Sequence, residues 1–169
     1  MLSSKSKNED SIDVFKLLKA SGTKSPGEKQ MVYTLASTTK TKPAKILVID
    51  DEPEITDIIE TFLETAGYEV KSENSSTIGV ERAKSYLPDL VLLDIIMPFI
   101  DGYEICRELK KCEETKNIPV VFLTGKDAQS DEGRSFQVGG VLFIKKPFSC
   151  ERLLDIVKVV LQTSERANK

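Results

Sequence analysis

Short apolar segments alternate with amphipathic segments from Lys45 to the end of the chain. After its first lysine, the segment 45–49 (KILVI) is continuously apolar, which is typical of a strand buried on both faces. In the next segment apolar residues recur three and four positions apart, which is the spacing of a helix with one buried face. Pro53 lies near the start of this segment and Gly67 at its end, where helices favour these residues. The apolar positions of this predicted helix are Ile55, Ile58, Ile59, Phe62, Leu63 and Ala66.

The same alternation continues through the rest of the chain. Gly133 weakens one of the expected helices, and Ser149 is suited to cap the last one. The expected strands are almost entirely apolar, except for one that is more polar, so we expect a parallel sheet covered by helices on both faces. This is a doubly wound α/β fold with five parallel strands. The further strands are expected at 68–72, 89–93, 118–124 and 141–145, and the further helices at 76–87, 103–112, 127–138 and 149–164.

Residues 1–44 differ in composition from the rest of the chain. They are rich in Ser, Thr, Lys, Gly and Pro, which is typical of a flexible linker. A short helix is expected at 10–20, where Ile12, Phe15 and Leu18 are spaced three apart, but it needs a surface on which to dock. We therefore expect an N-terminal extension over 1–44, a compact domain over 45–164 and a tail over 165–169.

Composition restricts the chemistry that this chain performs by itself. It contains no histidine, which excludes Ser-His-Asp and Cys-His catalysis, histidine-based zinc sites and a histidine phosphodonor within the chain. Its net charge of −3 gives no general attraction to nucleic acid or to an anionic membrane. No apolar run is long enough to span a bilayer, and the polar N-terminus does not resemble a signal peptide. Cys106, Cys112 and Cys150 lack metal-site spacing and indicate reduced thiols in a cytoplasmic protein.

Polar residues that suit phosphoryl chemistry follow four of the five expected strands. In a doubly wound fold the functional groups gather at the carboxyl ends of the strands. Asp50 and Asp51 follow the first strand, Asp94 the third, Thr124 ends the fourth and Lys146 follows the fifth. Crowded carboxylates stay ionised only beside a cation, and hard oxygen ligands favour Mg²⁺. Asp94 would then be a metal ligand and also a nucleophile that forms an aspartyl phosphate, with Lys146 and Thr124 contacting the phosphoryl group.

Five motifs at these strand ends carry a resemblance to a known family. The segments ILVIDDEPE, PDLVLLDIIMP, DG, IPVVFLTG and KKPF, in this order and spacing, resemble the receiver domain of two-component response regulators. The resemblance covers residues 45 to about 163. It implies a flavodoxin-like receiver fold with strand order 2-1-3-4-5 and a function in a two-component phosphorelay.

The resemblance also assigns roles to the acidic residues. Asp94 would accept the phosphoryl group from a phosphohistidine on a histidine kinase or a histidine phosphotransfer protein. Asp50, Asp51 and Asp94 would bind Mg²⁺ together with the backbone carbonyl of Ile96.

The remaining implied roles concern the phosphoryl group and a conformational switch. Thr124 and Lys146 would bind the phosphoryl oxygens, and Phe143 would turn inward when Thr124 moves towards the phosphate. Pro147 would follow the lysine through a cis peptide bond, which X–Pro bonds permit. The run GGVLF at 139–143 lacks the two acidic residues common in this family, so we expect a more apolar surface beside the fourth helix.

Other functions suit parts of the same pattern. An FMN-binding flavodoxin-like protein needs a phosphate-binding loop after the first strand, where this chain has the acidic DDEPE. A dehalogenase-type phosphatase needs a second acid two residues after Asp94, where this chain has Ile96. A pseudo-receiver, which is a protein-binding module without phosphotransfer, usually lacks one of the acids, the Thr or the Lys, and it stays the alternative. Taken alone, Asp50 suits an acidic helix cap, and Lys146 suits an exposed strand end, which is where we expect it.

We therefore expect a response regulator that consists of a single receiver domain. Only the residues ERANK follow the last expected helix, so an output domain is not expected. The protein would signal by contact with a downstream protein target or a second copy of itself, without direct binding to nucleic acid or membrane. We do not expect it to be an enzyme, beyond taking a phosphoryl group from a phosphodonor and dephosphorylating itself.

Overall fold

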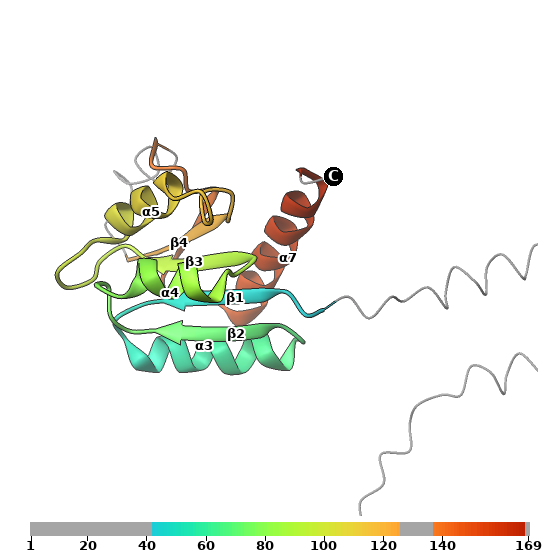
Figure 1. Cartoon of the computed structure of the whole chain (residues 1–169). Helices are drawn as coiled ribbons and strands as arrows, with labels where there is room; N and C mark the ends of the chain where they lie inside the picture. Colours follow the sequence, from blue (N-terminus) through green and yellow to red (C-terminus); the bar gives the residue numbers. More distant parts are fainter. Residues whose placement is uncertain (1–41, 126–136, 168–169) are drawn as a thin grey trace, which may run out of the picture. The chain divides into compact units, whose positions relative to one another are not determined.

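Strands and helices alternate along the chain in the computed structural model, which describes residues 42–125 and 137–167 (Figure 1). The strands are β1 (Lys45–Ile49), β2 (Glu69–Glu73), β3 (Leu90–Asp94), β4 (Val120–Thr124) and β5 (Leu142–Lys145). The helices are α3 (Pro53–Thr65), α4 (Gly79–Tyr86), α5 (Gly102–Lys111) and α7 (Cys150–Ala167).

The five strands form one parallel sheet in the order β2-β1-β3-β4-β5. β1 lies between β2 and β3, with Ile46 opposite Val70 on one side and Leu90 on the other. The prediction of a doubly wound sheet with strand order 2-1-3-4-5 is confirmed. Because all the strands are parallel, their carboxyl ends meet at one edge of the sheet.

Helices cover both faces of this sheet. Because side chains alternate between the faces along a strand, Leu47 and Ile49 join one core cluster, whereas Ile46 and Val48 join the other. The first cluster also contains residues of α4 and α5, and the second contains residues of α3 and α7. All four of these β1 side chains are fully buried, which explains why the strand is apolar on both faces.

Local sequence explains how the helices begin. α3 starts with a proline, and α5 is capped by Asp101, whose carboxylate accepts a hydrogen bond from the Glu104 N–H at 2.7 Å. The sequence pattern predicted a start of α4 at residue 76, but this helix begins at Gly79. Ser76 belongs instead to the preceding loop, where its hydroxyl donates a hydrogen bond to the Pro98 carbonyl.

Several expectations lie wholly or partly outside the described residues. They concern the extension 1–44 apart from its last three residues, the short helix at 10–20, and most of the weak helix at 127–138. α7 runs to Ala167 and thus continues into the expected tail at 165–169. None of the helices that the structure describes is long and apolar enough to cross a membrane.

Candidate functional site

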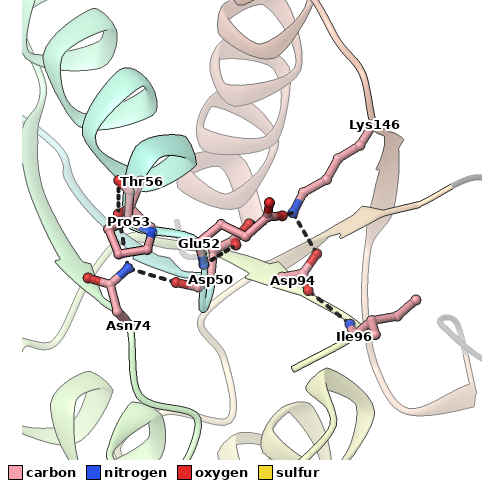
Figure 2. A network of polar contacts seen from close by, with 8 residues as sticks. All are labelled: Asp50, Glu52, Pro53, Thr56, Asn74, Asp94, Ile96 and Lys146. Carbon is pink, nitrogen blue, oxygen red and sulfur yellow. Dashed lines mark hydrogen bonds and ion pairs between the residues drawn. The ribbon is translucent and has the colours of Figure 1, made fainter. Parts of the chain in front are cut away.

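Three of the predicted site residues, Asp50, Asp94 and Lys146, meet at the carboxyl edge of the sheet (Figure 2). Asp50 directly follows β1, Asp94 is the last residue of β3, and Thr124 is the last residue of β4. Lys146 directly follows β5, and its ammonium group contacts the carboxylates of both Asp50 and Asp94. The parallel sheet therefore brings together residues that are up to 96 positions apart in the sequence.

Asp50 is the most deeply buried member of the site. Its carboxylate accepts hydrogen bonds from the Lys146 ammonium at 2.6 Å and from the Glu52 N–H at 3.0 Å. The side-chain amide of Asn74 donates to the backbone carbonyl of Asp50 at 2.8 Å. Burial raises the pKa of Asp50 above its ordinary value, while the hydrogen bonds from Lys146 and the Glu52 N–H oppose that rise.

The Asp94 carboxylate has a hydrogen-bond donor on each oxygen. Oδ1 lies 2.9 Å from the Lys146 ammonium, and Oδ2 accepts a hydrogen bond from the Ile96 N–H at 2.9 Å. The side chain is 7% exposed. Burial and the nearby Asp50 charge raise the pKa of Asp94 to about 6 despite the opposing effect of Lys146. Asp94 is therefore mainly ionised at neutral pH, but its charge is poorly solvated.

Lys146 is the cation that balances these carboxylates. Burial acts to lower its pKa, but the hydrogen bonds to Asp50 and Asp94 outweigh burial and raise the pKa above its ordinary value. The side chain is only 17% exposed, so the expectation of an exposed strand end is wrong for Lys146. Attraction to the buried carboxylates draws it inward, and Lys145 is the exposed residue at the end of β5. The peptide bond from Lys146 to Pro147 is cis, as the resemblance implies.

Asp50, Asp51 and Asp94 form an acidic cluster that suits a metal ion. One carboxylate oxygen from each residue lies within 4.8 Å of the others. Ligand oxygens around one small divalent cation are roughly 3–4 Å apart, so modest side-chain movements would bring all three into coordination. The Lys146 ammonium also lies 3.3 Å from the Glu52 carboxylate, so one ammonium group faces the three acidic residues of the cluster and Glu52. This leaves an excess of negative charge, which a divalent cation would neutralise.

Thr124 lies at the carboxyl end of β4, and Phe143 lies in β5. Thr124 is buried, and its hydroxyl donates a hydrogen bond to the Gly125 carbonyl at 3.3 Å. Apart from Gly125 itself and its two chain neighbours, no described residue has a heavy atom within 4 Å of a Cβ built on Gly125. Phe143 is partly buried and packs against the core cluster that contains Tyr103 and Phe122. Its role as a switch stays a prediction.

Ile96 and Val141 are exposed apolar residues. The side chain of Ile96 points away from the Asp94 carboxylate in Figure 2, and the residue is 70% exposed. Coordination of a metal through the Ile96 carbonyl stays a prediction, since the contact that the structure shows is made by the N–H. Val141 is 40% exposed, which agrees with the apolar surface expected near β5.

Sequence reasoning missed two residues that support the site, Asn74 and Gly102. Asn74 directly follows β2, and its amide donates to the Asp50 carbonyl and to the Thr56 hydroxyl at 3.0 Å. The strand-end rule would have identified Asn74 if we had applied it to β2. A Cβ on Gly102 would lie 2.1 Å from the backbone carbonyl oxygen of Asp94, so glycine alone fits there. The DG motif included Gly102, but the close approach of the Asp94 carbonyl that requires glycine there is visible only in the structure.

Comparisons with known proteins agree with this geometry. Residues 46–158 match the family profile of the response regulator receiver domain. The DNA-binding dual master transcriptional regulator RpaA of Synechocystis is 36% identical over 122 residues, which cover 72% of this chain and 51% of that protein. The chain spans about half the length of the curated relatives it matches.

Solved structures show the same similarity. A CheY-like response regulator receiver domain protein from Methanospirillum hungatei is 26% identical with a TM-score of 0.70, and the match covers 75% of this chain and 99% of that chain. The chemotaxis protein CheY4 of Vibrio cholerae is 27% identical with a TM-score of 0.67, and the match covers 70% of this chain and 98% of that chain.

Proposed function

Since this chain belongs to the response regulator receiver family of two-component signalling, we propose that Asp94 accepts a phosphoryl group from a phosphohistidine of a partner protein. The observation that carries this proposal is the buried Asp94 carboxylate, which lies 2.9 Å from the Lys146 ammonium and has an oxygen within 4.8 Å of oxygens of Asp50 and Asp51. The partner is a histidine kinase or a histidine phosphotransfer protein, because this chain has no histidine of its own.

In the proposed reaction a carboxylate oxygen of Asp94 attacks the phosphorus atom of the donor. The bond between phosphorus and the imidazole nitrogen breaks, and the imidazole leaves with a proton from solvent. Asp94 then carries an acyl phosphate, which water hydrolyses to restore the carboxylate. A pKa of about 6 keeps Asp94 mainly ionised at neutral pH, so that no base is required to activate it.

The residues around Asp94 are suited to hold the phosphoryl group. Lys146 already contacts Asp94, so its ammonium group lies where a phosphoryl oxygen on that residue would bind. Thr124 ends β4, the strand that pairs with β3, and its hydroxyl would donate to a second phosphoryl oxygen. Asp50, Asp51 and Asp94, with the carbonyl of Ile96, would hold Mg²⁺, which when bound neutralises charge on the carboxylates and the phosphoryl oxygens.

Signal output is proposed to pass from Thr124 to Phe143. Phe143 lies opposite Phe122 in the pairing of β4 with β5 and is only partly buried, so an inward rotation would bury more of its ring. This movement would change the surface beside β5, where Val141 is exposed. A downstream protein, or a second copy of this chain, would bind the changed surface.

Intact-mass measurement after incubation with acetyl phosphate and Mg²⁺ tests the proposed acceptor. We expect one added phosphoryl group on the wild-type chain and none on Asp94→Asn. The matched control Asp57→Asn removes an exposed acid of α3 and should be phosphorylated like the wild type. Equal incorporation in wild type and Asp94→Asn would place the acceptor elsewhere. No incorporation in a wild-type chain with intact circular dichroism would favour the pseudo-receiver.

A further inference from the structure

The loop between Asp94 and α5 contains a strained turn centred on Phe99. Phe99 has a φ of 69°, in the left-handed region that bulky side chains rarely adopt. The N–H of Ile100 donates to the Pro98 carbonyl at 2.9 Å, which closes a three-residue γ-turn around Phe99. A γ-turn with a positive φ at its centre is the rare and strained form of this turn.

Leu87 provides a comparison within the same molecule. In the described segments it is the other non-glycine residue with a positive φ, which is 49°. Leu87 is the C-cap of α4, and its N–H donates to the Ala83 carbonyl at 2.9 Å, an arrangement in which helices commonly end. A helix end therefore explains the conformation of Leu87, whereas Phe99 has no such explanation.

Hydrogen bonds from neighbouring segments hold the Phe99 turn in place. The hydroxyl of the buried Ser76 donates to the Pro98 carbonyl, so this carbonyl accepts two hydrogen bonds. At the base of the loop the N–H of Gly102 donates to the Ile95 carbonyl at 3.0 Å. Strained backbone conformations persist where surrounding contacts fix them, and they cluster at functional sites.

The Phe99 ring is almost entirely exposed to solvent. Phe99 is 94% exposed, and Ile96 in the same loop is 70% exposed. The ring therefore contributes no burial that would offset the strain of its own backbone. Large aromatic side chains are enriched at protein interfaces, where they bury much area at a low cost in conformational entropy. An exposed ring on a hydrogen-bonded turn is therefore available for a contact with another protein.

The loop also places Phe99 close to the phosphoryl acceptor. A Cβ on Gly102 would lie 2.1 Å from the Asp94 carbonyl oxygen, so the loop returns to Asp94 three residues after Phe99. Three residues span at most about 11 Å. Because the Asp94 carboxylate is buried, a protein that delivers a phosphohistidine must press its surface against the residues around Asp94. Phe99 lies within reach of that surface.

We propose that Phe99 is a contact residue for the protein that donates the phosphoryl group to Asp94, and that the strained turn presents the ring for this contact. The inference rests on the proposed function. A donor must align its phosphohistidine with a buried carboxylate, and a preorganised contact beside Asp94 reduces the entropy that this alignment costs.

Glycine variants separate this contact from folding. Phe99→Gly removes the ring and also the steric strain of a side chain at positive φ. Leu87→Gly removes a side chain at positive φ in the same way, at the end of α4 and before β3 begins. A histidine kinase is first selected from a panel because it transfers its phosphoryl group to the wild-type chain. The phosphorylation rate of each variant is then measured with acetyl phosphate and with this autophosphorylated kinase. For Phe99→Gly we expect a loss of kcat/KM with the kinase of roughly tenfold or more, and a rate with acetyl phosphate within about twofold of wild type. Leu87→Gly should stay within about twofold with both donors.

A tryptophan probe measures the contact directly, because the chain has no tryptophan of its own. In Phe99→Trp, addition of the kinase should shift the emission to shorter wavelength and protect it from acrylamide quenching. An unchanged kcat/KM for Phe99→Gly, or an unchanged emission from Phe99→Trp, would overturn the inference. An equal loss with both donors would also overturn it, because Phe99 would then act on the geometry of Asp94. If acetyl phosphate fails to label the wild-type chain, the proposed function itself fails.

Discussion

Replacement of Asp94 by Asn should stabilise the metal-free protein. The folded state buries the Asp94 carboxylate close to that of Asp50 and thereby raises the pKa of Asp94 from its ordinary value of 3.8 to about 6. Asn has nearly the same shape and can still accept a hydrogen bond from Lys146, but it carries no charge that must be desolvated. Folding of the variant therefore avoids the cost of burying this carboxylate.

The size of this stabilisation follows from the difference in the pKa of Asp94 between the folded and the unfolded chain. A rise of about 2 units corresponds to roughly 3 kcal/mol at pH 7, where Asp94 is mainly ionised in both states. Because folding raises the pKa of this acid, burial of Asp94 lowers the free energy of unfolding only when the carboxyl group ionises. This destabilisation is absent below the unfolded pKa, grows as the pH rises from about 4 to about 6, and is constant above that. At pH 5 it amounts to about 1.5 kcal/mol. The amide cannot accept from the Ile96 N–H as well, which removes about 1 kcal/mol of the gain.

Urea unfolding followed by circular dichroism, in the presence of EDTA at pH 5 and pH 7, measures this effect. We expect Asp94→Asn to be about 2 kcal/mol more stable than wild type at pH 7, with most of the advantage lost at pH 5. Asp57→Asn, which changes an exposed acid, should remain within about 0.5 kcal/mol of wild type at both values. If Asp94→Asn is the less stable protein at pH 7, or if its advantage is independent of pH, burial of this charge is not the dominant effect.

Three further changes test other parts of the site. Lys146→Ala should lower the free energy of unfolding by about 3 kcal/mol or more, because it leaves buried carboxylates without their cation. Its control, Lys145→Ala at the exposed strand end, should lower it by less than about 0.5 kcal/mol. Similar stabilities of the two variants would contradict the burial of Lys146. Gly102→Ala should lower stability by about 1–3 kcal/mol and slow phosphorylation by acetyl phosphate, because its Cβ meets the Asp94 carbonyl, and Gly125→Ala is the control that should do neither. Mg²⁺ at a hundredfold excess over its Kd should raise the free energy of unfolding of the wild type by about 2.7 kcal/mol and thereby raise its thermal midpoint. The midpoint of Asp94→Asn should rise less, and equal shifts would mean that Asp94 is not a ligand.

The fold was predictable because the buried strands have a simple sequence signature. Strands buried on both faces, such as β1 and β3, are apolar except for Lys45 at the start of β1 and Asp94 at the end of β3. Parallel strands then place their carboxyl ends together. The edge strand β2 shows the limit of this reasoning. Glu73 at its end is buried and paired with Arg82 at 3.0 Å, and hydrophobicity gives no sign of such a pair. Its predicted range, 68–72, accordingly ended one residue early.

The identities of the main site residues were likewise predictable, but their environments were not. Asp50, Asp94 and Lys146 were found because each lies at a strand end. The burial of Lys146 depends on carboxylates that lie 52 and 96 residues earlier in the chain, and no local pattern contains that information. The turn at Phe99 depends in the same way on Ser76, which belongs to the loop after a different strand.

The order of the strands in the sequence affects how the charges of the site come together during synthesis. Asp50 and Asp94 are neighbours once β1 pairs with β3, whereas Lys146 arrives with β5, the last strand of the sheet to be made. At about 5–20 residues per second, the ribosome needs roughly 3–10 s to add the 52 residues between Asp94 and Lys146. During this interval protons and solvent cations are the available counterions for the two carboxylates. We therefore expect β1 and β3 of the nascent chain to pair more readily when a divalent cation is present, and docking of β5 then adds the ammonium group of Lys146 to the site.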